Sequence, residues 1–179
     1  MTGLAVSSSW LTSATVAIIF AFASQVSAAD LIGPATVVDG DTIRVGTTVV
    51  RLEGIDAPEA SQQCRDAEGR LFACGQRAAR FLNDLIEGEV VSCELTGRDR
   101  YGRALGICFV AGRDINSEMV RSGWALAFRR YSARYVGEER EAEASGAGLW
   151  SGTFYMPWDW RAGIVTESGN AMDRYRGEN

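Results

Sequence analysis

Two short clusters of carboxylates, with an arginine between them, are the first candidates for chemistry in this sequence. Asp39 and Asp41 flank a glycine, and Asp56 and Glu59 flank an alanine and a proline. Arg51 stands inside an apolar run, where a charged side chain is expected to be paired or functional. Each cluster also has an ordinary structural interpretation, because Asp and Gly favour turns and the second cluster follows a strand.

The combination matches what phosphoryl transfer requires. Asp41 and Asp56 are hard oxygen ligands suited to Ca²⁺ or Mg²⁺, and Glu59 is a candidate general base for water. Arg51 and Arg103 offer planar forks that fit the oxygens of a phosphodiester. A cation, a base and preorganised positive charge together stabilise the charge that develops in such a reaction. The ordinary alternative for Arg103, which lies beside a turn, is a solvated surface residue.

The composition limits the alternatives. All eighteen basic residues are arginine, and the chain has no lysine and no histidine. Catalysis by Ser-His-Asp or Cys-His groups and zinc binding by histidine are therefore excluded. The net charge of −5 is unexpected for a nucleic-acid-binding protein, which normally carries a basic surface. A bound divalent cation would reduce this mismatch locally.

The N-terminus predicts export. Residues 1–28 contain no charged side chain, and the apolar run from Leu11 to Phe22 is too short for a comfortable membrane span. Small residues at Val26-Ser27-Ala28 favour cleavage after Ala28. We therefore expect a signal peptide over 1–28, a domain over 29–161 and a polar tail over 162–179, in a periplasmic or secreted protein. The segment lacks an initial Lys or Arg, so an uncleaved membrane anchor is the alternative.

Four cysteines behind an export signal favour two disulfides, for which three connectivities exist. A zinc site is the rival, but the spacing contains no C-x₂-C. If strands at 90–95 and 104–110 pair about a turn near Arg100 and Tyr101, Cys93 lies opposite Cys108. By elimination, Cys64 then pairs with Cys74.

Short β-branched runs at 35–38, 42–45 and 48–52 are separated by Gly and Asp, which is typical of antiparallel strands. Apolar spacing predicts a helix over 74–87, after an irregular loop at 59–73. Further helices are expected from an N-cap at Asp114 through Val120, and from Ser132 to Ala147, where glycines stop it. Five strands with about three helices predict an α+β OB-fold, a small five-stranded β-barrel.

The order of several motifs is similar to that of the staphylococcal nuclease (thermonuclease) family. The resemblance covers about residues 34–152 and rests on the segments 37–43, 51–59, 99–103, 114–116, 119–120, 123–125 and 148–150. It implies the OB-fold and a Ca²⁺-dependent hydrolase that releases 3′-phosphate products from DNA or RNA. We also expect a monomer without a stable protein partner, and no membrane contact unless the N-terminal segment is uncleaved. The chain departs from the family's type member in being acidic and in having cysteines.

The resemblance also implies individual roles. The carboxylates of Asp41 and Asp56 and the backbone carbonyl of Ala57 would bind Ca²⁺, with Asp39 behind these ligands. Glu59 would be the general base, Arg51 would bind the scissile phosphate, and Arg103 would stabilise the transition state. Tyr101 and Arg100 would contact the bound nucleotide.

Two other functions are open for such a sequence, because a fold does not fix a function. One is an OB-fold module that binds without catalysis, and the other is a calcium-stabilised structural domain of the envelope. Binding modules usually lack the Arg, Glu and Arg positions, which are present here as Arg51, Glu59 and Arg103.

Overall fold

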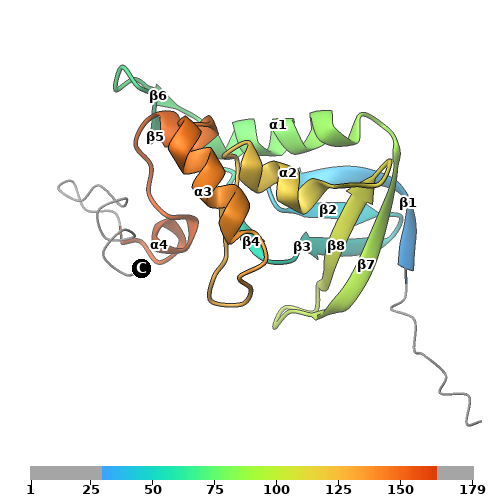
Figure 1. Ribbon diagram of the computed structural model, residues 1–179. Helices are drawn as coiled ribbons and strands as arrows, with labels where there is room; N and C mark the ends of the chain where they lie inside the picture. Colours follow the sequence, from blue (N-terminus) through green and yellow to red (C-terminus); the bar gives the residue numbers. More distant parts are fainter. Residues whose placement is uncertain (1–29, 165–179) are drawn as a thin grey trace, which may run out of the picture.

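Five strands close into a β-barrel in the computed structural model, which describes residues 30–164 (Figure 1). The barrel strands are β1 (Asp30–Asp39), β2 (Thr42–Val45), β3 (Thr48–Leu52), β7 (Val90–Arg98) and β8 (Ala104–Val110). They lie in the order β3-β2-β1-β7-β8 with antiparallel neighbours, and a parallel pairing of β3 with β8 closes the barrel. The predicted OB-fold is confirmed. The predicted signal peptide (1–28) and residues 165–179 of the predicted tail lie outside the described residues.

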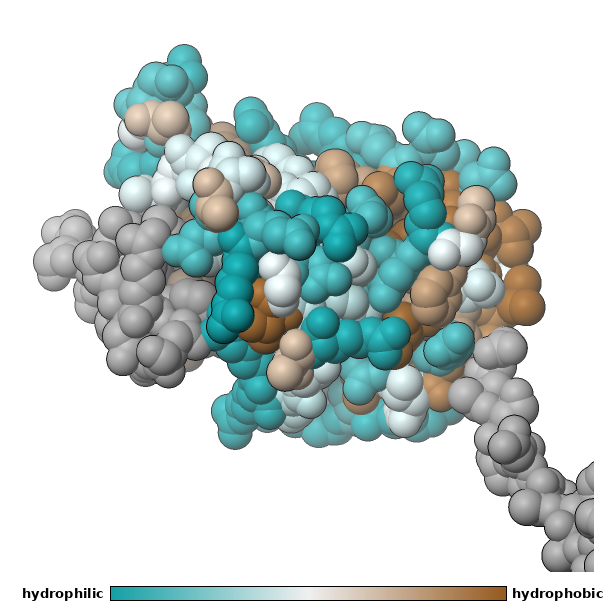
Figure 2. All heavy atoms as spheres, in the orientation of Figure 1, coloured by the Kyte–Doolittle hydropathy of each residue, from teal (hydrophilic) through white to brown (hydrophobic). Residues whose placement is uncertain are grey.

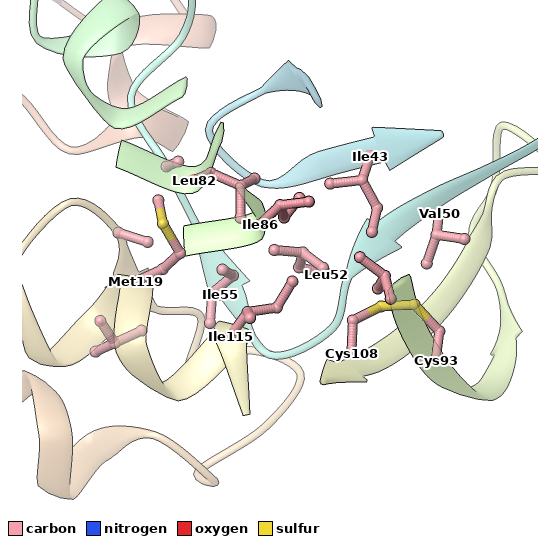
Figure 3. Close-up of a cluster of buried hydrophobic side chains, with 14 of the residues drawn as sticks. Ile43, Val50, Leu52, Ile55, Leu82, Ile86, Cys93, Cys108, Ile115 and Met119 are labelled. Carbon is pink, nitrogen blue, oxygen red and sulfur yellow. A yellow bond between two sulfur atoms is a disulfide. The ribbon is translucent and has the colours of Figure 1, made fainter. Parts of the chain in front are cut away.

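The barrel interior is filled by alternate strand residues and by one face of helix α1 (Cys74–Ile86). Ile43, Val50 and Leu52 are buried on β2 and β3, in the same core cluster as Leu82 and Ile86 of α1. Val50 lies at the end of the cluster next to the Cys93–Cys108 disulfide (Figure 3). All five side chains are at most 3% exposed, so β2 and β3 share one buried core with α1. Asp41 directly precedes β2, and Arg51 lies on β3.

Both predicted disulfides are present. Cys93 and Cys108 face each other across β7 and β8, in the register expected from the turn between these strands. Cys64 pairs with Cys74 and joins strand β5 (Cys64–Arg65) to the first residue of α1. The second disulfide therefore closes the loop that follows Glu59.

The remaining helices differ from the prediction in their bounds. Helix α2 (Ile115–Arg121) begins as expected, because the Asp114 side chain accepts the Ser117 N–H at 3.0 Å. Helix α3 (Val136–Ser145) is shorter than the predicted 132–147. Its preceding residue, Tyr135, is buried and donates its hydroxyl to Asp114 at 3.0 Å, which holds that segment in a turn. Gly146 ends α3 in the left-handed region, as predicted.

Several short elements were not predicted from the sequence. The expected irregular loop at 59–73 contains a small hairpin of β5 and β6 (Leu71–Phe72). Strand β4 (Ile55–Asp56) pairs with β10 (Leu126–Ala127), and β9 (Arg113–Asp114) extends the sheet beside β8. A 3₁₀ helix, η1 (Gly148–Ser151), precedes helix α4 (Pro157–Arg161).

The described surface is mainly hydrophilic on the face shown in Figure 2. Exposed hydrophobic side chains on neighbouring barrel strands include Ile32 of β1 and Val90 of β7. Within residues 30–164, no helix has the length and apolar character needed to cross a membrane.

Candidate active site

Asp41 and Arg51 are brought together by the pairing of β2 with β3. Thr42, the first residue of β2, lies opposite Arg51, and the Leu52 N–H donates to the Asp41 carbonyl at 2.8 Å. The Asp39 carboxylate accepts the Asp41 N–H at 3.1 Å and so holds the turn between β1 and β2. Asp39 thus supports the position of Asp41, while also acting as the turn residue that its sequence context suggested.

Asp56 joins this pair from β4. Strand β4 is anchored by β10, where Leu126 lies opposite Asp56. The Arg51 guanidinium bridges the two carboxylates, with Nη1 2.5 Å from Oδ1 of Asp41 and Nη2 2.6 Å from Oδ1 of Asp56. The Ala57 N–H donates to the other oxygen of Asp41 at 3.0 Å. Two carboxylates, one before β2 and one on β4, therefore converge on one arginine of β3.

Glu59 lies in the loop after β4, and the buried side chain of Gln62 fixes its backbone. Gln62 Oε1 accepts the Glu59 N–H at 3.1 Å, and Gln62 Nε2 donates to the Tyr155 carbonyl at 2.8 Å. Helix α1 packs tightly against the same loop at Gly75, where a Cβ would lie 1.8 Å from the Glu59 carbonyl oxygen. Only glycine fits there, so the start of α1 fixes the loop that carries Glu59.

A second guanidinium, from Arg161 at the end of α4, also reaches the cluster. Its Nη2 lies 2.6 Å from Oδ2 of Asp56, and its Nη1 lies 3.0 Å from Oδ1 of Asp56 and 2.6 Å from Oε1 of Glu59. Arg161 thus links the carboxylate of β4 to that of the following loop. The sequence prediction did not include this residue.

The electrostatics of the cluster reflect buried negative charge. The pKa of Asp41 is raised to about 7, mainly by burial and also by the neighbouring carboxylates Asp39 and Asp56, whereas Arg51 and the Ala57 N–H oppose the shift. Burial on its own would lower the pKa of Arg51, but Asp41 and Asp56 raise it above its ordinary value. In the same way, Asp56 and Glu59 outweigh burial and raise the pKa of Arg161. Both arginines stay charged, and the cluster favours a further cation.

The turn between β7 and β8 carries the other predicted site residues. Arg103 Nε donates to Oδ2 of Asp99 at 2.7 Å, and the Tyr101 and Arg103 N–H groups both donate to Oδ1 of Asp99 at 2.9 Å. The guanidinium carbons of Arg100 and Arg103 lie 4.8 and 5.7 Å from the centroid of the exposed Tyr101 ring. Asp99 therefore organises the turn.

Arg103 does not hydrogen-bond to Asp41, Asp56 or Glu59. The carboxylate groups of these residues accept from Arg51, Arg161, the Thr42 hydroxyl and the Ala57 N–H. Arg103 is linked to them through the barrel, because Ala104 lies opposite Val50 in the parallel pairing of β8 with β3. Strand β3, which carries Arg51, and strand β8, which begins directly after Arg103, are thus direct neighbours. Arg51 on β3 and Arg103, the residue just before β8, therefore belong to neighbouring parts of the barrel wall.

A cation would find hard oxygen ligands at this site. Within residues 30–164, no three Asp, Glu, Cys or His side chains are grouped so as to hold a metal ion by themselves. The predicted ligand set consists of two carboxylates, Asp41 and Asp56, and the backbone carbonyl of Ala57. It therefore does not require a group of three such side chains. Asp56 already binds two cationic side chains, so the residues present fit a positively charged ligand.

Sequence reasoning missed two polar residues of the site. Gln62 lies in a polar loop that offers no signal of burial. Arg161 follows Pro157, a residue favoured at the first position of a helix, and this was the only available sign that α4 exists.

Known proteins resemble this chain over most of its length. A model of the family described as staphylococcal nuclease homologue matches residues 49–152. The succinoglycan biosynthesis protein ExoI of Rhizobium meliloti is 39% identical over 127 residues, which cover 69% of this chain and 66% of that protein. The chain thus spans slightly less than two thirds of that relative.

Other relatives are matched over more of their length. An uncharacterized endonuclease of Escherichia coli O157:H7 is 34% identical over 153 residues, covering 80% of this chain and 94% of that protein. The micrococcal nuclease of Shigella flexneri is 37% identical over 143 residues, covering 70% of this chain and 76% of that protein. With its β-barrel, its family match and these relatives, the chain belongs to the staphylococcal nuclease family.

Proposed function

We propose that this protein is a Ca²⁺-dependent nuclease that hydrolyses phosphodiester bonds of DNA and RNA and leaves 3′-phosphate ends. The observation that carries the proposal is the convergence of Asp41 and Asp56 on the Arg51 guanidinium, with Glu59 beside them. Two hard oxygen ligands, a candidate base and a phosphate-binding fork then share one end of the barrel. Relatives named as endonuclease or micrococcal nuclease support the same activity.

The proposed roles follow from these positions. Asp41 and Asp56, with the Ala57 carbonyl, would hold Ca²⁺, and Asp39 would keep Asp41 in place. The bound ion would supply positive charge for the phosphodiester and its attacking water. Glu59 accepts a proton from that water as the water oxygen bonds to phosphorus.

The two arginines then act on the phosphate. Arg51 binds its non-bridging oxygens through a planar fork, and Arg103 meets charge that develops as the bond to the 5′-oxygen breaks. The leaving 5′-oxygen takes up a proton, and the phosphate stays on the 3′-oxygen. Tyr101 and Arg100 would contact the neighbouring nucleotide from the exposed turn.

We also propose that the protein is exported and acts as a monomer. The two disulfides, Cys64–Cys74 and Cys93–Cys108, are typical of an oxidising compartment. The mass of the protein recovered from the periplasm or medium tests this proposal, since cleavage after Ala28 would leave a chain that begins at Ala29.

Metal removal tests the activity. The protein is dialysed against chelator, and cleavage of a single-stranded DNA oligonucleotide is measured with chelator or with added Ca²⁺. We expect no cleavage in chelator and restored cleavage with Ca²⁺, because the ion is proposed to supply the positive charge that stabilises the attacked phosphodiester and its water. Full turnover in chelator would contradict the metal assignment.

The same samples separate the alternatives. Oligonucleotide binding without cleavage under any metal condition would favour a binding module. A Ca²⁺-dependent rise in melting temperature with neither binding nor cleavage would favour a calcium-stabilised structural domain.

A further inference from the structure

The segment after residue 152 lies beyond the match to the family but packs against the candidate active site. Arg65 and Thr153 exchange backbone hydrogen bonds at 2.8 and 2.9 Å, and the Tyr155 carbonyl accepts from the buried Gln62 side chain. Trp158 of α4 stacks on Phe128 with ring centroids 5.8 Å apart. These contacts hold α4 beside β4 and the Glu59 loop, in agreement with its place in Figure 1.

This docking gives Arg161 an unusual set of partners. Its guanidinium hydrogen-bonds to both carboxylate oxygens of Asp56 and to one oxygen of Glu59. The Asp56 side chain is completely buried, whereas that of Arg161 is 38% exposed. Arg161 therefore covers Asp56 from the solvent side, which is the direction from which a metal ion and a substrate must arrive.

A metal ion bound by Asp56 would need an oxygen that Arg161 now occupies. Oδ1 of Asp56 already accepts from both Arg51 and Arg161, and Oδ2 accepts from Arg161, so a metal ion would be a third cation on one buried carboxylate and would meet strong repulsion from the guanidinium groups. Metal binding must therefore displace the Arg161 guanidinium from at least part of Asp56. The same displacement frees Glu59, which a general base requires.

The displaced guanidinium stays close to the reaction centre. Gln62 and Phe128 hold the segment that carries Arg161, so the side chain can rotate but α4 remains in place. Next to Glu59, the guanidinium meets the position of the attacked phosphodiester, whose oxygens match its planar fork.

We propose that Arg161 is a third phosphate-binding arginine, a substrate-positioning residue that neutralises Asp56 and Glu59 in the metal-free protein and exchanges them for the phosphodiester when Ca²⁺ binds. This inference rests on the proposed function. It assigns a role to α4, which lies outside the part of the chain that matches the family.

The test compares Arg161→Gln, Arg161→Lys and the wild type, with Arg140→Gln as a control on the exposed surface of α3. Calorimetric titration with Ca²⁺ in the absence of nucleic acid gives the metal affinity. Steady-state cleavage of a single-stranded DNA oligonucleotide at saturating Ca²⁺ gives KM and kcat, and thermal melts confirm that each variant is folded.

Arg161→Gln is expected to bind Ca²⁺ about tenfold more tightly, because no internal cation has to be displaced. Its KM is expected to rise about tenfold, with a smaller change in kcat. Arg161→Lys keeps the charge but not the fork, so its Ca²⁺ affinity should stay near that of the wild type while its KM rises. Arg140→Gln should match the wild type in all three quantities.

An arginine that only braces the Glu59 loop would give the opposite result. In that case Arg161→Gln would bind Ca²⁺ equally or more weakly, and this outcome, or an unchanged KM, overturns the inference. A wild-type protein that binds no Ca²⁺ or cleaves no DNA removes the proposed function itself, and the inference with it.

Discussion

Two of the arginine–aspartate contacts in the described chain, one at Arg51 and one at Arg103, lie in different physical settings. Arg51 bridges Asp41 and Asp56 at the barrel end, where the side chain of Asp56 is fully buried and that of Arg51 is 14% exposed. Arg103 pairs with Asp99 in the turn between β7 and β8, where the arginine side chain is 31% exposed. The first pair is built into the fold, whereas the second organises only a surface turn. We therefore expect stability and activity to be coupled at Arg51 and separable at Arg103.

The difference follows from how each pair is assembled. The Arg51 cluster joins β3, the turn after β1, and β4, so its partners come together only when the barrel forms. The Arg103 pair is local, since Asp99 lies four residues away and binds two backbone N–H groups of the same turn. A local pair forms without the barrel and contributes little to global stability.

The largest effect is expected from Arg51→Gln. The substitution leaves Asp41 and Asp56 close together without their shared cation, and removing one partner of a buried ion pair costs about 3–5 kcal/mol. In metal-free buffer the melting temperature should fall by about 10 °C. At saturating Ca²⁺, kcat should also fall by about 10²-fold or more, because a phosphate-binding fork is lost.

Arg44→Gln is the matched control, because Arg44 is exposed on the neighbouring strand β2. It should change stability by less than about 0.5 kcal/mol and leave turnover unaltered. An Arg51→Gln protein that melts like the wild type would show that the Arg51 bridge does not stabilise the barrel. The expected difference in stability between the Arg51 cluster and the Arg103–Asp99 pair would then be wrong.

Arg103→Ala should separate the two properties. If Arg103 meets charge that develops only in the transition state, its loss lowers kcat by about 10²–10³, or about 2.7–4 kcal/mol, with little change in substrate binding. Arg103→Lys should be nearly as damaging, because an ammonium group cannot reproduce the planar fork. Thermal melts of both variants should stay close to that of the wild type.

Arg113→Ala, an exposed arginine of β9, serves as the control for charge removal near β8. Near-normal kcat in a normally folded Arg103→Ala protein would leave Arg103 as a solvated residue of the turn. The proposed transition-state role would then be lost, while the Arg51 cluster would be unaffected.

The sequence predicted the parts of this molecule that depend on local pattern. Short β-branched runs separated by Gly and Asp predicted β1, β2 and β3, and the symmetry of Cys93 and Cys108 about the turn predicted their pairing. The Asp114 side chain, as a helix cap, gave the start of α2. In each of these cases, neighbouring residues carry the physical cause.

What the sequence did not predict depends on tertiary contacts. Helix α4 has five residues and no side-chain cap, so the stacking of Trp158 on Phe128 is needed to hold it. Arg161 reaches Asp56 across 105 positions of sequence, a relation that no local pattern contains. Its proximity to Glu59 likewise exists only after α4 has docked.

The smallest effect is expected at Tyr101, an exposed residue of the turn. Tyr101 is 69% exposed, so its ring is available to stack on a base of the substrate. Stacking of a base on an aromatic ring is worth about 1–3 kcal/mol. The guanidinium groups of Arg100 and Arg103 also contact this ring. We therefore expect a stacking energy at the lower end of that range, which corresponds to a rise in KM of about fivefold in Tyr101→Leu. Tyr101→Phe keeps the ring and should have a KM near that of the wild type.

The balance between KM and kcat decides what Tyr101 does. If the ring stacks on a base, Tyr101→Leu changes KM and leaves kcat within about twofold. If the ring instead holds Arg103 in place, the 5.7 Å contact between them is lost, and kcat falls while KM stays constant. Either way, melting should not change, because an exposed side chain on a local turn contributes little to the barrel. A lower melting temperature in Tyr101→Leu would mean that the turn is coupled to the barrel after all, and the contrast between the two arginine–aspartate pairs would have to be abandoned.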